Sequence, residues 1–152
     1  MNNSYIEVDM QILRENMASI ASTLTPGAGI IPVLKDDAYG LGLVPVARVL
    51  EPLDCVRCFS VSHVSEGLEL RRGGITMPIL ILGHTPPEYT SVLIENRITQ
   101  TVSCYAKALE YSTAATALGA VLKIHIKLDT GMSRLGFLCA GEYFDEGVQN
   151  VI

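Results

Sequence analysis

The chain has 152 residues, of which 49% are hydrophobic and 18% charged, and its formal net charge is −5. This composition is typical of one globular domain, and the acidic balance argues against a nucleic-acid partner, which would need a basic face. The longest purely aliphatic run, Ile79–Leu82, is too short to span a bilayer, and residues 1–7 lack the basic flank and apolar core of a secretory signal. The sequence therefore predicts a cytoplasmic protein without a membrane partner.

Helical and strand-like patterns alternate along the chain. Apolar side chains recur at three- and four-residue spacing from Met10 to Leu24 and predict a leading helix, with Asp9 as its N-cap and residues 26–27 as its stop. The first strand is predicted at residues 30–35, with Pro32 tolerated near its beginning. Further strands are predicted at residues 56–61, 78–82, 98–102 and 121–128. The helices between them are predicted at residues 43–50, 64–72, 88–95 and 105–118.

Five strands that alternate with helices are typical of parallel α/β folds. Two architectures fit this count, namely the N-terminal five βα units of a (β/α)8 TIM-type barrel and an open doubly wound sheet. A full barrel takes about 250 residues, so the chain would hold an incomplete one. An open five-stranded sheet would need no further strands, and the strand count alone does not decide between the two.

A lysine ends the first predicted strand, at the position where barrel enzymes place catalytic groups. The amine of Lys35 is able to form an imine with an aldehyde cofactor once low-dielectric surroundings favour the loss of its proton. Tyr39 follows four residues later and is placed to bring its hydroxyl near a cofactor phosphate. The plain alternative is a lysine that ends a strand and reaches solvent.

The fifth predicted strand alternates between apolar and polar side chains. One face carries Ile124, Ile126 and Leu128, and the other carries Lys123, His125, Lys127 and Asp129. In a parallel barrel the apolar face packs on the helices, so the polar set turns toward the barrel interior, where charged groups are costly unless paired or functional. Glycines at positions 131 and 136 let the backbone turn around Arg134, whose guanidinium is suited to a carboxylate or a phenolate. A surface arginine in a glycine-rich loop is the alternative.

These two segments, VLKDDAYG at residues 33–40 and KLDTGMSRLG at residues 127–136, closely resemble the two N-terminal signatures of alanine racemases. Residues 6–9 and 79–88 are also similar to parts of that family, so the resemblance covers nearly the whole chain. It implies a barrel that binds pyridoxal 5'-phosphate and interconverts L-alanine and D-alanine, the latter for peptidoglycan precursor supply. The resemblance thus favours the barrel over the open sheet.

The resemblance also implies a role for each matching residue. Lys35 corresponds to the Schiff-base lysine, which is one of two acid–base catalysts. Tyr39 corresponds to the tyrosine that binds the cofactor phosphate, and Arg134 to the arginine near the cofactor's phenolic oxygen and the substrate carboxylate. Lys127 corresponds to a lysine that is carbamylated in several family members. A carbamate there would replace an ammonium that repels Arg134 with an anion that attracts it.

The family's second catalytic base is a tyrosine from the C-terminal β-domain of a partner subunit, and it has no counterpart in this sequence. We therefore expect residues 1–152 to form a partial racemase barrel domain without the β-domain, the full-length enzyme to be a homodimer, and the isolated chain to be inactive. Serine racemase, another barrel enzyme of the pyridoxal-phosphate class such as a decarboxylase, and a non-catalytic cofactor-binding protein remain as alternatives.

Cys55 and Cys58 form a C-x-x-C pair. The chain offers no second pair at zinc-site spacing, and Cys58 leads into a predicted strand instead of a helix. We expect two reduced thiols without a function, and no metal site.

Overall fold

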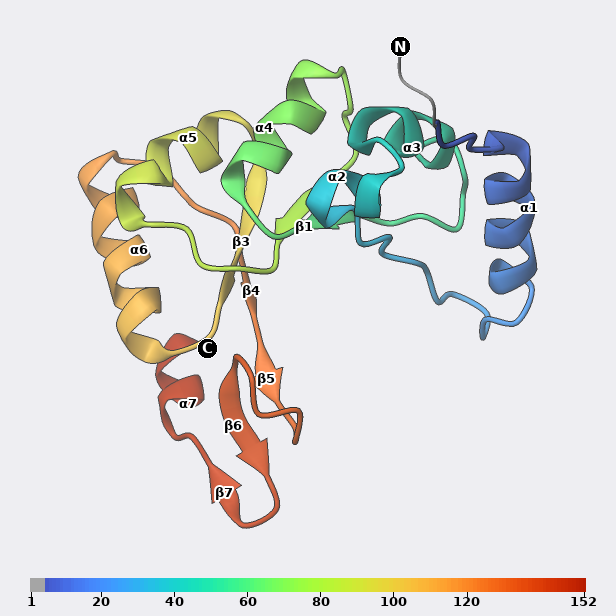
Figure 1. Ribbon diagram of the computed structural model, residues 1–152. Coiled ribbons are helices and arrows are strands. Elements are labelled where there is room, and N and C mark those ends of the chain that lie inside the picture. Colours follow the sequence, from blue (N-terminus) through green and yellow to red (C-terminus); the bar gives the residue numbers. More distant parts are fainter. Residues whose placement is uncertain (1–4) are drawn as a thin grey trace.

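The computed structural model describes residues 5–152 and contains two sheets (Figure 1). The main sheet has four parallel strands in the order β1 (Phe59–Val61), β2 (Ile79–Ile81), β3 (Ile98–Val102) and β4 (Ile124–Ile126). A smaller sheet of β5 (Leu128–Asp129), β6 (Phe137–Ala140) and β7 (Tyr143–Phe144) projects from the main body as an arm. No helix within residues 5–152 is long and apolar enough to cross a membrane.

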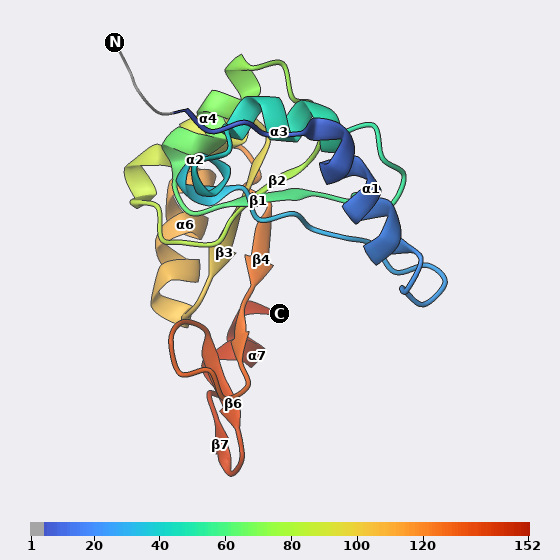
Figure 2. The ribbon, with the colours of Figure 1, turned by 45° about the vertical axis from the view of Figure 1, so that its right-hand side comes forward.

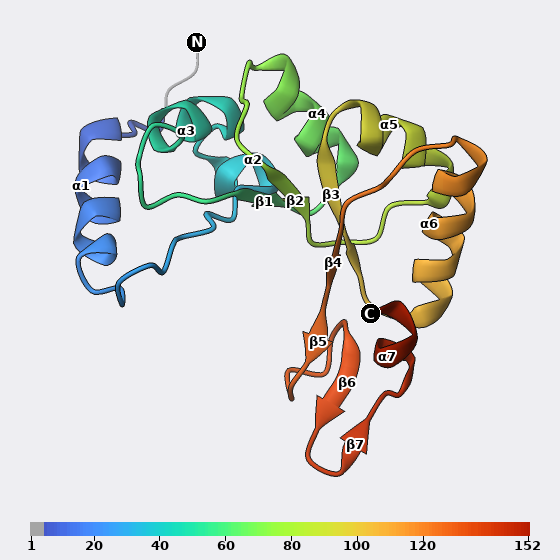
Figure 3. The same ribbon diagram turned by 180° about the vertical axis from the view of Figure 1, so that it is seen from behind.

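Successive strands of the main sheet are connected by α4 (Val64–Arg72), by the 3-10 turn η1 (Pro87–Tyr89) with α5 (Thr90–Glu95), and by α6 (Tyr105–Ala117). The helices α1 (Met10–Ala21), α2 (Lys35–Gly40) and α3 (Leu43–Leu50) precede β1, and α7 (Gly147–Val151) follows β7. Figure 2 shows α3 and α4 lying along the sheet, and Figure 3 shows from behind that α1 and α6 lie at opposite ends of the molecule. The core between sheet and helices contains fully buried side chains, including Phe59, Val61, Ile79, Ile81 and Leu93.

The order of the strands decides between the two predicted architectures. The segment before α2 runs parallel to β1 through two bridges, Ile30 to Val56 and Val33 to Ser60. With it, five parallel segments lie side by side in chain order. A doubly wound sheet reverses its strand order at a switch point, whereas a barrel continues in one direction. The predicted fold class, the first five βα units of a barrel, is confirmed.

Some predicted element boundaries were wrong for identifiable reasons. Residues 30–35 do not form a continuous strand, because Pro32 has no N–H to donate and only the two bridges remain. The first helix ends at Ala21, before the predicted stop, where the hydroxyls of Ser22 and Thr23 bond to helix carbonyls and compete with the backbone pattern.

The predicted strand 121–128 is divided between the two sheets. The N–H of Lys127 donates to Val102 of β3, but its carbonyl accepts from Phe137 of β6. The chain therefore changes partner at Lys127 and leaves the main sheet. The arm formed by β6 and β7 was not predicted.

Two charged side chains tie together the amino-terminal ends of β2 and β3. The guanidinium of Arg71 donates to the carbonyls of Ile75 and Met77 ahead of β2, and to those of residues 96 and 97 ahead of β3. The carboxylate of Glu51 accepts from the backbone N–H groups of Thr76 and Met77 at 2.7 and 2.8 Å. These contacts bind α3 and α4 to the entry points of the central strands.

The hydrogen bonds that Glu51 accepts from Thr76 and Met77 make the free energy of unfolding depend on pH in the acid range. Burial raises the pKa of Glu51, but the hydrogen bonds from Met77 and Thr76 outweigh it and hold that pKa below its ordinary value. Stability from a carboxylate with a lowered pKa is present above the unfolded pKa and is lost as pH falls through the folded one. We expect the thermal midpoint to fall as pH drops below 4.5, and to fall less steeply in Glu51→Gln. Identical acid profiles of the two proteins would contradict this expectation.

Candidate active site

Lys35 and Tyr39 lie on a turn of left-handed helix. The four residues 36–39 have φ angles between 52° and 56°. L-amino acids avoid this region at roughly 1–2 kcal/mol per residue, because Cβ approaches the following carbonyl oxygen. Four such residues in succession, none of them glycine, need support from the surrounding structure.

That support comes from hydrogen bonds on both sides of the turn. The N–H of Ala38, which is itself buried, donates to the carbonyl of Leu34 at 2.9 Å. The carboxylate of Asp37 accepts from the N–H of Leu43 at 2.7 Å and so joins the turn to α3. A third bond, from the N–H of Asp36 to Glu66 of α4, is 2.7 Å long. The turn is therefore held between α3 and α4.

The loop that carries Arg134 is organised around the carboxylate of Asp129. One carboxylate oxygen accepts from the N–H groups of Gly131 and Ser133, and the other from the N–H of Arg134, each at 3.0 Å. The bonds from Gly131 and Ser133 are the main reason that the pKa of Asp129 lies below its ordinary value. Asp129 thus binds the backbone of the loop, while the guanidinium of the exposed Arg134 donates to the sulfur of Met132 at 3.0 Å.

One cavity of about 570 Å³ brings the turn and the loop together. The four residues to which the resemblance gives a role, Lys35, Tyr39, Lys127 and Arg134, all line it, and so does Asp129. Lys35 is half-buried, and its Nζ lies 5.8 Å from the centre of the Tyr39 ring. The lysine does not simply end a strand in solvent, as its plain alternative required.

The polar face of the fifth strand reaches this cavity only in part. Lys123 and His125 are exposed and do not line it. Leu128, predicted to face the helices, lines the cavity instead. The alternation fails there because the chain passes from β3 to β6 at Lys127, which rotates the following residues.

The charges around the cavity favour an anionic ligand. Within residues 5–152, neither Lys35, Lys127 nor Arg134 forms an ion pair, and the ion pair recorded there joins Lys107 to Glu110 on α6. The carboxylate of Asp129 lines the same cavity, but it accepts from backbone N–H groups and makes no ion pair with these cations. Three cations against one carboxylate leave a net positive charge, and a bound anion lowers the mutual repulsion of the cations.

The donor set is compatible with pyridoxal phosphate, the cofactor that the resemblance implies. An amine is present for the aldehyde, a hydroxyl for the phosphate, and a guanidinium for a phenolate or carboxylate. No cluster of three or more His, Cys, Asp or Glu side chains suited to a metal ion occurs in the described part of the chain. Cys55 and Cys58 are free thiols, as expected, and burial raises the pKa of Cys58, which makes it a poor nucleophile at neutral pH.

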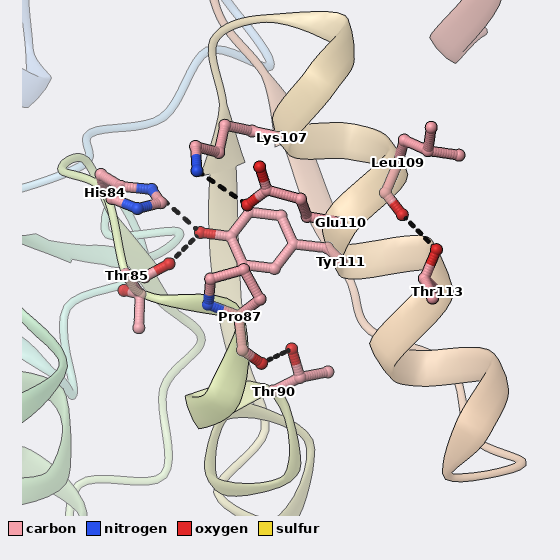
Figure 4. Close-up of polar contacts among 9 residues, drawn as sticks. All are labelled: His84, Thr85, Pro87, Thr90, Lys107, Leu109, Glu110, Tyr111 and Thr113. Carbon is pink, nitrogen blue, oxygen red and sulfur yellow. Dashed lines mark hydrogen bonds and ion pairs between the residues drawn. The ribbon is translucent and has the colours of Figure 1, made fainter.

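Sequence reasoning missed a group of polar contacts around the loop that follows β2, and Figure 4 shows those of Tyr111. The hydroxyl of Tyr111, on α6, donates to the carbonyl of Thr85 and lies 3.4 Å from Nδ1 of His84. The buried amide of Gln100, on β3, donates to the carbonyl of Gly83 at 2.8 Å. Gly83 lines the cavity, so β3 and α6 together fix the loop that follows β2. A glutamine at the centre of a predicted strand, between two threonines, was the available signal.

Gly136 and Gly131 provide a matched test of the Arg134 loop. Both have nearly the same φ, 131° and 132°, but a Cβ at Gly136 would lie 2.7 Å from the Asp129 backbone nitrogen, whereas Gly131 faces open space. We expect Gly136→Ala to lower stability by about 2 kcal/mol more than Gly131→Ala, because the backbone of β5 must move. Chemical denaturation of both variants measures the difference, and equal losses would contradict the role of this close approach.

Comparison with known proteins identifies the family. The family model described as alanine racemase, N-terminal domain, matches residues 8–150. The alanine racemase of Desulfovibrio desulfuricans is 42% identical over 132 residues, which are 87% of this chain and 35% of that protein. A solved alanine racemase of Clostridium difficile 630 superposes with a TM-score of 0.77 at 43% identity, over 83% of this chain and 33% of the other.

A second solved structure, the alanine racemase of Bacillus anthracis with bound L-Ala-P, superposes with a TM-score of 0.81 at 33% identity, over 90% of this chain and 35% of the other. The chain therefore spans about a third of the length of the relatives that it matches. The match of the family model runs from the first helix to α7 and includes both the Lys35 turn and the Arg134 loop. By sequence and by fold, the chain belongs to the alanine racemase N-terminal domain family.

Proposed function

We propose that residues 1–152 supply the cofactor-binding part of an alanine racemase active site, with Lys35 as the lysine that binds pyridoxal 5'-phosphate. The observation that carries the proposal is that Lys35, Tyr39 and Arg134 line the same cavity, in which neither Lys35 nor Arg134 forms an ion pair with a carboxylate of residues 5–152. The alanine racemase relative solved with L-Ala-P supports an alanine-derived ligand.

Each side chain has one task in this proposal. The amine of Lys35 would hold the cofactor covalently. The hydroxyl of Tyr39 donates to the phosphate, and Arg134 holds the substrate carboxylate or the phenolic oxygen. Lys127 lines the same wall as Arg134, and its carbamylation would turn repulsion between the two into attraction.

The bound cofactor supplies the electron sink that makes an amino-acid α-proton removable near neutral pH. The Lys35 amine would take up or return that proton on one face of Cα. A base on the opposite face is required for racemisation, and we expect it from a partner subunit in a cytoplasmic homodimer. The product, D-alanine, would serve peptidoglycan synthesis.

A trapping experiment tests the proposal. The purified chain is mixed with pyridoxal phosphate, reduced with borohydride and digested, and the modified peptide is located by mass spectrometry. We expect one cofactor per chain, attached at Lys35. Labelling spread over exposed lysines such as Lys123, with none preferred, would refute the assignment. The intact mass of the chain before reduction also shows whether Lys127 carries a carbamate.

A further inference from the structure

One carboxylate joins two separate segments of the cavity wall. Glu66 lies at the third position of α4, and one of its oxygens accepts from the N–H groups of Ser62 and His63 at 2.8 and 3.0 Å. Its other oxygen accepts from the N–H of Asp36 at 2.7 Å. Ser62 and Lys35, the residue before Asp36, both line the cavity.

The bond to Asp36 is placed where the left-handed turn begins. Asp36 is the first of the four residues with positive φ, and it directly follows Lys35. Its N–H points away from the turn and has Glu66 as its hydrogen-bond partner. Other bonds of the turn are made further along, where residue 38 donates to Leu34 and residue 37 accepts from Leu43. Glu66 therefore fixes the backbone at the point from which the Lys35 side chain departs.

We infer that Glu66 is a positioning residue, which holds the Lys35 turn in its left-handed form and so aims the amine into the cavity. The effect on cofactor capture rests on the proposed function. The hold of Glu66 on the Lys35 turn does not. A carboxylate suits this position because both oxygens accept, and three backbone donors converge on it.

The substitution Glu66→Gln separates the two interactions of this side chain, the cap of α4 and the bond to Asp36. A glutamine at the third helix position still caps a helix, so its oxygen is able to keep the bonds to Ser62 and His63. Its amide nitrogen then faces the N–H of Asp36, and two donors do not bond. The variant should retain α4 and lose the link to the Lys35 turn.

Glu51→Gln is the matched control. Glu51 is also a carboxylate that accepts two backbone N–H groups, but these belong to Thr76 and Met77 at the opposite end of the strands. It reports the general effect of this substitution on stability without touching the turn. Thermal unfolding of both variants shows whether they are comparably folded.

Hydrogen exchange followed by NMR tests the structural part without any cofactor. In Glu66→Gln we expect the amide of Asp36 to exchange at least about tenfold faster than in wild type, which corresponds to the loss of one charge-assisted bond. The amides of Ser62 and His63 should remain close to wild type, and Glu51→Gln should leave Asp36 unchanged. Unaltered exchange at Asp36 in Glu66→Gln would overturn the inference.

Cofactor capture tests the consequence. We expect Glu66→Gln to bind pyridoxal phosphate about tenfold more weakly than Glu51→Gln, as measured by the absorbance of the bound cofactor. Equal affinities in the two variants would refute the positioning role, and so would general unfolding of Glu66→Gln alone. If the wild-type chain captures no cofactor, the proposed function fails, while the exchange of Asp36 still decides whether Glu66 holds the turn.

Discussion

Replacement of Lys35 by alanine should abolish the covalent capture of pyridoxal phosphate by this chain. Alanine has no amine with which to displace the aldehyde oxygen, so the loss should be complete and not partial. Borohydride trapping and intact-mass measurement, at one cofactor per chain, give the result directly. Because the Lys35 side chain is only half-buried, we expect the variant to remain folded.

Lys127→Ala is the appropriate control, because Lys127 lines the same cavity and carries the same amine. This variant should still form the adduct. Its affinity for phosphate-bearing ligands should fall, because one of the three cations that favour an anion is removed. If Lys35→Ala formed a stoichiometric adduct and Lys127→Ala did not, the cofactor-binding lysine would be Lys127 and not Lys35.

Replacement of Arg71 by methionine should cause the largest loss of stability, about 3 kcal/mol, because carbonyls on four residues lose a charged donor at once. The affected carbonyls lie ahead of β2 and β3, where α4 is joined to the sheet. For a chain of this size the loss corresponds to a fall of roughly 6–12 °C in Tm. Urea denaturation and calorimetry measure both quantities.

The neighbouring Arg72 serves as the control for this prediction. It lies in the same last turn of α4 but is exposed. Arg72→Met should change the stability by no more than about 0.5 kcal/mol, as is usual for surface positions. Comparable losses in the two variants would mean that the helix end, and not the bonds of Arg71, determines the effect.

Local sequence was sufficient for most of the fold. The bounds of α3, α4 and β3 were predicted without error, because apolar spacing and terminal glycines mark them clearly. The partner change at Lys127 was not predictable in this way. It depends on pairing with β6, a strand whose own residues show no clear alternation.

Four members of the site were recognisable from two short motifs, and the structure places all four around one cavity. Their support was not recognisable. Residues 36–39 contain no glycine to signal a positive φ, and the carboxylate of Glu66 that fixes Asp36 comes from 30 positions away in the sequence. Sequence patterns describe neighbours along the chain, whereas this turn depends on a neighbour in space.

The Arg71 and Glu51 anchors lie where the central strands begin, and the cavity lies where they end. The contacts that stabilise the fold and the residues that bind the ligand thus lie at opposite ends of the same strands. An engineer could randomise the residues around the cavity to alter ligand choice while leaving the stabilising contacts untouched. Conversely, substitutions near the beginning of the strands could raise thermal stability without disturbing the Lys35 amine.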